Sequence, residues 1–125
     1  MLKMSDTRRA LGNRGETLAA QKLQSLGYTI HERNWRCAVG ELDIVAEKDD
    51  MLIFVEVRTR RGDRFGTPEE SITPAKRAKL IEVAWTYLDE HDAEDRNWRI
   101  DVVAVEVGSR GEVVRIDVLE NAIEQ

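Results

Sequence analysis

Residues 40–60, GELDIVAEKDDMLIFVEVRTR, constrain the fold of this chain more than any other segment. Two runs rich in strand-forming apolar residues flank the polar stretch EKDD, a pattern that is typical of a β-hairpin. If Asp49 and Asp50 form the turn, the loop has two residues, which is the commonest length for a tight hairpin. The sequence therefore predicts two antiparallel strands that are neighbours in one sheet.

A two-residue turn also sets the register of this hairpin and brings acidic residues together. Counting back from the turn places Asp43 directly opposite Glu56 on one face of the sheet, because side chains alternate along each strand. Glu41 and Arg58 fall on the same face, opposite each other. A slip of one residue would put Asp43 and Glu56 on opposite faces.

Two facing carboxylates in an apolar strand need compensation, because like charges at this spacing destabilise a sheet and buried charges require partners. Three sources of compensation are open: the Arg58 side chain, a proton shared between the acids, or a hard divalent cation that carboxylate oxygens would bind. Alternatively, Glu41 and Asp43 are surface charges of the hairpin edge, and Glu56 pairs with an arginine.

Glu16 is a third acidic candidate for this site, on a helix that the sequence predicts before the hairpin. It precedes Ala19, Ala20 and Leu23 at helical spacing, and so it extends the stripe that packs on the sheet. The alternative is a surface acid near a helix start, where the helix dipole favours negative charge.

The rest of the chain adds two helices and three strands to the hairpin. Caps, apolar stripes and alternation predict the order αβββαββ in one domain, residues 1–125, with a core from about residue 8 to 119. The predicted elements are a helix at 6–26, a strand at 28–35, a long loop at 60–72, a helix from Pro74 to about 90 capped by Thr73, an acidic connector at 89–95, and strands at 98–107 and 112–119. This pattern predicts an α/β fold, in which a central mixed five-stranded sheet is flanked by helices.

Basic residues follow the acidic strand and open the second helix. They are Arg60, Arg61 and Arg64 in the loop region and Lys76, Arg77 and Lys79 in the helix. Cations at a helix start run against the usual preference for acids there. An acidic metal centre beside such residues suits a phosphodiester backbone. The alternative is a solubilising polar surface.

The charge balance restricts how this chain could bind nucleic acid. Lys and Arg total 19 against 24 Asp and Glu, for a net charge of -5, which excludes an indiscriminate electrostatic binder. The connector at 89–95 alone holds five of the acids, which leaves 19 residues of each sign in the rest of the chain. Selective contact through a local basic rim is therefore compatible with this composition.

Other features of the sequence exclude several classes of protein or predict structural roles. No apolar run approaches the ~20 residues of a membrane span, and the N-terminus has no apolar signal core, so a cytoplasmic protein without a membrane partner is expected. Cys37 is the single cysteine, which excludes an intrachain disulfide and a cysteine metal cluster. Packing is the role expected of Trp35, Trp85 and Trp98, and Asp101 is expected to pair with an arginine or a loop N–H.

Three segments together resemble one known family, from about Gly12 to Val105: GNRGETLAAQKLQSLGYTIHERNWRCAVGELDIVAEKDDMLIFVEVRTRRG, ITPAKRAKLIEVAWTYL and RIDVVAV. They look like the YraN-like family of bacterial proteins, which are called endonuclease-like. That family is similar to archaeal Holliday junction resolvases and to the wider restriction-endonuclease-like superfamily. The resemblance implies an α/β/α core with a mixed sheet, and a metal site built from a helix Glu, a strand Asp and an E-x-K motif.

Carried onto this sequence, the resemblance implies Glu16, Asp43, Glu56 and position 58 as the catalytic residues, with Glu41 as an accessory acid. The metal, Mg²⁺ or Mn²⁺, would be held by Asp43 and Glu56, with Glu16 binding directly or through water. Position 58 is Arg where the motif has Lys, and an arginine donates hydrogen bonds and positive charge but does not lose a proton to act as a base. Resolvase-like enzymes usually work as dimers, so a homodimer is also implied.

We therefore expect a metal-dependent nuclease that hydrolyses phosphodiester bonds in DNA, including branched or structured DNA, with Arg58 stabilising charge. Two other functions stay open. One is a nucleic-acid-binding protein that retains the nuclease fold without turnover, and the other is a partner-binding domain whose acids are structural.

Overall fold

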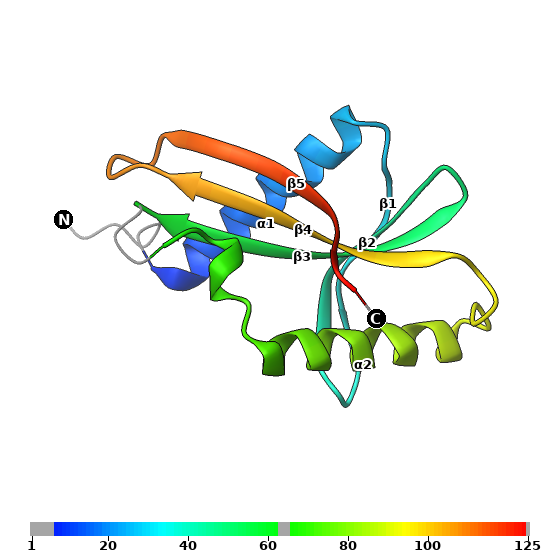
Figure 1. The fold of residues 1–125 in the computed structure, drawn as a ribbon. Helices are drawn as coiled ribbons and strands as arrows, with labels where there is room; N and C mark the ends of the chain where they lie inside the picture. Colours follow the sequence, from blue (N-terminus) through cyan, green and yellow to red (C-terminus); the bar gives the residue numbers. More distant parts are fainter. Residues whose placement is uncertain (1–6, 63–65, 125) are drawn as a thin grey trace.

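The computed structural model describes residues 7–62 and 66–124. Its elements follow the predicted order, with a short 3-10 helix added in the loop before the second α-helix. They are α1 (Arg8–Ser25), β1 (Thr29–Arg36), β2 (Glu41–Lys48), β3 (Met51–Arg61), η2 (Glu69–Ser71), α2 (Pro74–Glu90), β4 (Trp98–Val107) and β5 (Val113–Ile123). The two α-helices lie on opposite sides of the sheet (Figure 1).

The five strands form one mixed sheet in the order β1-β2-β3-β4-β5. Neighbouring strands are antiparallel except β3 and β4, which are parallel because α2 carries the chain back across one face of the sheet between them. The predicted α/β fold with a mixed five-stranded sheet flanked by helices is therefore confirmed.

The β2–β3 hairpin has the predicted turn and register. Asp49 and Asp50 both have left-handed backbones, with φ of 53° and 63°, as a type I′ turn requires. Pairing runs from this turn to Ile44 opposite Val55, in the register that a two-residue loop sets. The hairpin therefore carries the chain into the candidate site with the alignment expected from the sequence.

Both helices begin at a threonine cap, and Thr73 is the cap expected from the sequence. The Thr7 Oγ1 atom accepts a hydrogen bond from the backbone N–H of Ala10 at 3.0 Å, and Thr73 Oγ1 accepts one from Lys76 at 3.2 Å. Such caps satisfy N–H groups that have no partner within the helix. Gly27 follows α1 with φ of 94°, a left-handed conformation that suits the end of a helix.

Apolar side chains form a core on each face of the sheet. On one face, α1 contributes Ala19, Ala20 and Leu23 to a cluster that includes Ile53 and Val55 of β3. On the other face, α2 packs on the alternate residues of β3. Its buried residues there are Leu80, Val83, Ala84, Tyr87 and Leu88, in the same cluster as Leu52 and Phe54. The period-two alternation of β3 thus separates two layers, each covered by one helix.

The three tryptophans have packing roles, as expected. The Trp35 ring contacts Tyr87 edge-on with centroids 5.0 Å apart, and Trp98 contacts Phe54 with centroids 5.7 Å apart. Trp85 is 47% exposed and packs its ring against Trp98. Edge-to-face contacts of this kind add to the free energy gained from burial.

Asp101 is fully buried in β4 and holds three parts of the chain together. Its carboxylate accepts hydrogen bonds from the Tyr28 hydroxyl at 2.9 Å, from Arg99 Nε at 2.8 Å and from the backbone N–H of Asn121 at 2.9 Å. Burial and the bond to Asp101 raise the pKa of Tyr28 to about 12. Both predicted kinds of partner, an arginine and a backbone N–H, are present. The Asn121 bond also fastens the end of β5, which extends beyond the predicted residue 119 to Ile123.

Gly15 allows α1 to approach β3 closely. A Cβ atom at this position would collide with the Thr59 side chain, whereas a Cβ at Gly12 on the same helix meets nothing within 4 Å. We expect Gly15→Ala to lower the free energy of unfolding by ~1–2 kcal/mol, because overpacking outweighs the gain in helix propensity. The matched change Gly12→Ala should raise it by ~0.5–1 kcal/mol. Urea denaturation measures both, and equal effects of the two changes would contradict the close approach.

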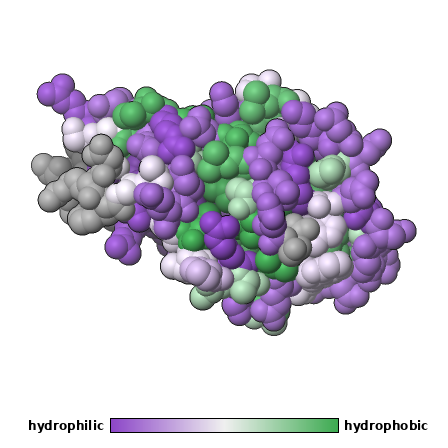
Figure 2. Space-filling view, viewed as in Figure 1, coloured by the Kyte–Doolittle hydropathy of each residue, from purple (hydrophilic) through white to green (hydrophobic). Residues whose placement is uncertain are grey.

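Hydrophilic residues cover much of the face seen in Figure 2, around a central band of hydrophobic residues. Among the residues that the structure describes, the exposed large hydrophobic side chains are those of Leu26, Trp85, Val113 and Val114. Neither α1 nor α2 has the length and apolar character needed to cross a membrane, and these are the α-helices of the described residues.

Candidate functional site

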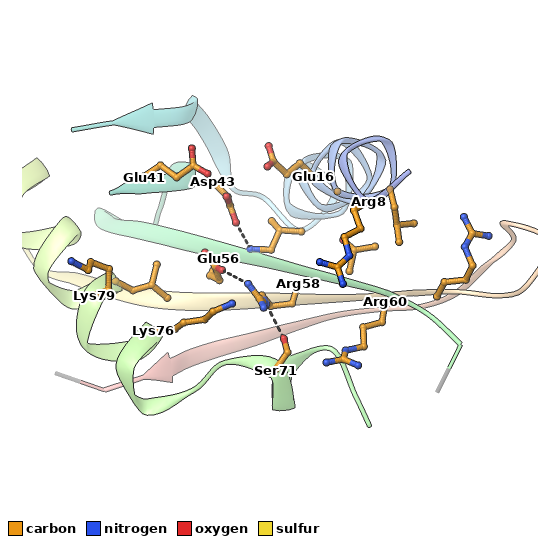
Figure 3. Close-up of a pocket in the computed structure, with 16 residues that line it drawn as sticks. Arg8, Glu16, Glu41, Asp43, Glu56, Arg58, Arg60, Ser71, Lys76 and Lys79 are labelled. Carbon is orange, nitrogen blue, oxygen red and sulfur yellow. Dashed lines mark hydrogen bonds and ion pairs between the residues drawn. The ribbon is translucent and has the colours of Figure 1, made fainter. Parts of the chain in front are cut away.

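A cavity of about 840 Å³ lies where β2 begins and β3 ends, with the first turns of α1 and α2 on either side (Figure 3). Acidic and basic side chains line it together. The acids are Glu16, Glu41, Asp43 and Glu56, and the bases are Arg8, Arg58, Arg60, Arg61, Lys76 and Lys79. The cavity therefore brings together all the acidic site residues predicted from the sequence, along with position 58.

Asp43 lies where the pairing of β2 with β3 stops. Its Oδ2 atom accepts a hydrogen bond from the backbone N–H of Val57 at 2.8 Å, so a side chain takes the place of a backbone acceptor. The alternation of β2 also breaks here, since Leu42 packs on the α2 side of the sheet and Ile44 on the α1 side. A strand residue that leaves the regular ladder can point its side chain into a site that the sheet would otherwise fill.

The carboxyl groups of Asp43 and Glu56 lie close enough to interact strongly. Burial raises the pKa of Asp43 to about 8, with the negative charge of Glu56 and a hydrogen bond to it also acting in this direction. The N–H of Val57 opposes the shift but does not overcome it. The predicted proximity of the two acids is confirmed, and a proton on Asp43 is one source of the compensation they need.

Arg58 supplies the second source of compensation. Its Nη1 atom donates to Glu56 Oε2 at 3.1 Å, and its Nε donates to Ser71 Oγ at 2.9 Å. Ser71 in turn donates to the backbone carbonyl of Pro68 at 2.5 Å. The guanidinium group is thus held between the acid of β3 and the short helix η2. The pattern of the sequence did not point to Ser71, because it acts through a contact with a different element.

Glu16 and Glu41 lie at the edge of the acid pair with arginine partners of their own. Burial and the charge of Asp43 raise the pKa of Glu16, and Arg33 lies 3.7 Å from its carboxylate. Glu41 Oε2 lies 3.1 Å from Arg36 Nε, and the Glu41 side chain is about half exposed. The expectation that Glu41 faces Arg58 is wrong, because regular pairing of β2 with β3 ends before Glu41 is reached.

The short helix η2 is fixed to the sheet by an ion cluster around Arg115 of β5. This arginine lies 2.8 Å from Glu69, 2.6 Å from Glu106 and 2.7 Å from Asp117. Hydrogen bonds to these carboxylates raise the pKa of Arg115, and the same arginine lowers the pKa of Glu69. The cluster therefore holds the segment that carries Ser71.

Basic side chains stand on two sides of the acid pair. Figure 3 shows Lys76 and Lys79 of α2 on one side of Glu56, and Arg8 of α1 with Arg60 of β3 on the other. Cations on both sides of an acidic centre suit a polyanion that crosses it. The two sides come from elements far apart in the sequence, which the fold brings to one cavity.

The predicted basic residues do not all line this cavity. Lys76, Lys79, Arg60 and Arg61 do, whereas Arg77 donates from Nη1 to the carbonyl of Ala122 at 3.2 Å. Arg64 lies outside the described residues. Arg8, which no sequence pattern indicated, also lines the cavity because the first turn of α1 lies beside the end of β3.

Comparison with known proteins assigns the chain to a family. The model of the family described as "Uncharacterised protein family UPF0102" matches residues 15–105. The chain belongs to the UPF0102 family. A UPF0102 protein of Roseiflexus castenholzii is 50% identical over 123 residues, covering 98% of this chain and 99% of the relative. One from Pelotomaculum thermopropionicum is 44% identical over 119 residues, covering 95% and 99%.

These matches confirm the predicted membership of the YraN-like family, which is UPF0102. The matched range contains all four acids of the cavity and Arg58, whereas Arg8 lies before it. Among solved structures, the chain is similar to Pyrococcus furiosus SfsA in complex with Ca²⁺, with a TM-score of 0.42 and 17% identity over 94% of this chain and 65% of that chain. The link to Holliday junction resolvases and to the restriction-endonuclease-like superfamily stays a prediction.

The acid pair of this UPF0102 protein fits a hydrated divalent cation. Asp43 and Glu56 offer hard oxygen donors, although one oxygen of each also bonds to Val57 or Arg58. In the part of the chain that the structure describes, no group of three or more His, Cys, Asp or Glu side chains is arranged to hold a metal ion. Mg²⁺ commonly binds through one or two carboxylates and keeps several waters. The donor set therefore suits a water-rich Mg²⁺ or Mn²⁺ site and not a closed protein cage.

Proposed function

We propose that this UPF0102 protein is a metal-dependent nuclease that hydrolyses phosphodiester bonds in DNA. The observation that carries the proposal is the facing pair of Asp43 and Glu56 in a cavity lined by six basic residues. Two carboxylates held together favour a divalent cation, and basic groups around them favour a ligand with several phosphates. The combination matches what hydrolysis of a phosphodiester backbone requires.

The residues of the cavity have separate roles in this proposal. Asp43 and Glu56 would hold Mg²⁺ or Mn²⁺, with Glu16 acting through water, and the bound ion supplies Lewis-acid polarisation of the phosphate and a more acidic water. Lys76 and Lys79 on one side of the cavity hold phosphates of the backbone. On the other side Arg8, Arg60 and Arg61 do the same.

Arg58 has a narrower role than the lysine that the resemblance implies at its position. Its guanidinium group donates hydrogen bonds and positive charge to phosphoryl oxygens, but it does not act as a base, because its proton is not lost at accessible pH. Ser71 holds the Nε edge at 2.9 Å, which orients the remaining N–H groups. Arg58 thus stabilises charge that develops on the phosphate.

A second candidate is a nucleic-acid-binding protein that retains the cavity without turnover. The ion pair between Arg58 and Glu56, together with the raised pKa of Asp43, favours it. The arginine neutralises Glu56 and a bound proton neutralises Asp43, so neither acid needs a metal ion. In this case the basic residues bind the backbone, and the acids contribute no cleavage.

Cleavage assays on linear, flapped and four-way DNA test the proposal, with the branched substrates chosen because of the resemblance to archaeal Holliday junction resolvases. The wild-type protein should cleave in Mg²⁺ or Mn²⁺ and lose activity in EDTA. Glu56→Gln should lower the rate by at least ~100-fold, because it removes one of two carboxylates that hold the ion. Gel electrophoresis of end-labelled DNA measures the rate.

Glu47→Gln is the matched control, since Glu47 also lies in the β2–β3 hairpin but pairs with His31 and Arg96 outside the cavity. Its rate should equal that of the wild type. Equal cleavage by wild type and Glu56→Gln would contradict the proposed site. DNA binding without cleavage of any substrate would favour the binding protein.

A further inference from the structure

Five exposed arginines gather at one end of the molecule, and we call this surface the arginine end. They are Arg8, Arg9 and Arg14 of α1, Arg61 at the end of β3 and Arg110 in the β4–β5 turn. Figure 1 shows the start of α1, the end of β3 and the β4–β5 turn at the same end of the fold. Three segments that are distant in the sequence therefore contribute to one basic surface.

Hydrogen bonds between these segments fix the arginine end. Arg14 Nη1 donates to the carbonyl of Gly111 at 2.5 Å, and Arg61 Nη1 donates to the carbonyl of Gly108 at 3.3 Å. The backbone N–H of Gly62 donates to the carbonyl of Val107 at 2.9 Å. These bonds use neutral acceptors, so the guanidinium groups keep their full charge and most of their N–H donors.

The arginines of the arginine end share a lack of acidic partners within the described ranges, which Arg77 of α2 also shows. Among residues 7–62 and 66–124, none of the five arginines of this end forms an ion pair with a carboxylate. By contrast, ion pairs to carboxylates engage Arg33, Arg36, Arg58, Arg96, Arg99 and Arg115. Glu112 lies in the same turn as Arg110, but it accepts from the backbone N–H of that residue. Five arginines without a carboxylate partner among the described residues therefore lie at one end of the fold.

This surface is continuous with the candidate site, because Arg8 and Arg61 line the cavity as well as belonging to the arginine end. Arg9, Arg14 and Arg110 extend the basic surface beyond the cavity. Arg8 and Arg14 are six residues apart on one helix, about 9 Å along its axis, which is roughly three base-pair steps of duplex DNA. Six residues also leave the two side chains about 120° apart around the helix, with Arg8 at the cavity and Arg14 at the β4–β5 turn. The two arginines therefore suit contact with different phosphates.

We infer that the arginine end binds the phosphates of a duplex nucleic-acid arm that leaves the cavity on the α1 side. The inference rests on the proposed function for the placement of DNA in the cavity, but it concerns binding and needs no cleavage. Guanidinium groups without acidic partners bind phosphate oxygens, often with two parallel hydrogen bonds. The arm contacts carry no base specificity, since they reach only the backbone.

Fluorescence anisotropy with a labelled 30-base-pair DNA in EDTA tests this inference. The variant Arg9→Gln/Arg14→Gln/Arg110→Gln removes three charges that lie outside the cavity lining. We expect at least ~10-fold weaker binding, and a slope of log Kd against log salt that is smaller by about 2–3, since each phosphate contact contributes about 0.9. Arg9→Gln/Arg110→Gln keeps the Arg14–Gly111 bond and should show the same effect in smaller measure.

The control variant is Lys22→Gln/Lys48→Gln/Arg96→Gln. It removes the same charge at the far end of the sheet, where α1 ends and the β2–β3 turn lies. It should bind DNA as the wild type does. Equal losses of DNA affinity in both triple variants would show that only net charge matters, and would overturn the inference. Tighter binding of anionic phosphatidylserine vesicles than of DNA would also overturn it. If the wild-type protein cleaves no DNA, the nuclease proposal is refuted. Weaker DNA binding by the arginine variant would then still support the arginine end.

Discussion

Replacing Asp101 by alanine is expected to lower the free energy of unfolding by about 3–5 kcal/mol and the Tm by on the order of 10–20 °C. The Asp101 side chain is 0% exposed and accepts hydrogen bonds from Tyr28, Arg99 and the backbone of Asn121. Its loss leaves these donors unpaired in a buried place, and an unsatisfied buried donor costs more free energy than its hydrogen bond contributes. Thermal and urea denaturation followed by circular dichroism measure the change.

The chain supplies a close control for this experiment in Asp117. Like Asp101, it pairs with an arginine two residues before it in the same strand, Arg115 Nε, at 2.7 Å. Asp117 is 54% exposed, so water replaces its partners when the side chain is removed. Asp117→Ala should cost only ~0–1 kcal/mol. Similar losses for the two variants would show that burial of Asp101 does not determine its contribution.

Asp43→Asn is expected to stabilise the metal-free protein at pH 8 by roughly 2–4 kcal/mol. Folding raises the pKa of Asp43 from its ordinary value of 3.8 to about 8, so the folded protein binds this proton more tightly than the unfolded chain. The contribution of this proton to the free energy of unfolding has its full value below pH ~4 and is lost as the pH rises through about 8. Asparagine has no proton to lose, and its amide still accepts from Val57 and donates to Glu56.

The measurement is the difference in Tm between Asp43→Asn and the wild type in EDTA at several pH values. The difference should be small near pH 4 and grow toward pH 8. Other acids are present in both proteins, so their effects on Tm cancel in this difference. Saturating Mn²⁺ should raise the Tm of the wild type more than that of the variant, because binding to the folded state alone stabilises it. A wild type that is the more stable protein in EDTA at pH 8 would contradict the raised pKa.

Local chemistry made much of the fold predictable from the sequence. Asp49 and Asp50 tolerate left-handed backbones, so the hairpin turn and its register followed from two residues. The Thr73 cap placed the start of the second helix, and a lone acid in an apolar strand indicated the partners of Asp101. In each case the physical cause lies within a few residues of the feature it determines, or it is a requirement that any fold must satisfy.

The candidate site was less predictable, because its details depend on contacts between distant segments. The break in alternation at Asp43 follows from where β2 leaves β3, which no periodic pattern records. The link from Arg115 to Glu69 spans 46 residues, and it supports Ser71, which the sequence did not single out. Arg8 lies at the cavity because α1 packs against β3, a contact that includes the close approach of Gly15 to Thr59.

The bond between the Asp43 side chain and the Val57 N–H has a consequence for which residues this position tolerates. Because the carboxylate completes the hydrogen bonding of a neighbouring strand, position 43 must supply an acceptor oxygen at the reach of an aspartate. Glutamate keeps the carboxyl group but is one methylene longer, and alanine leaves the N–H without an acceptor. Asparagine alone satisfies the backbone while removing the acid, so at this position strand geometry and acid chemistry limit substitution together.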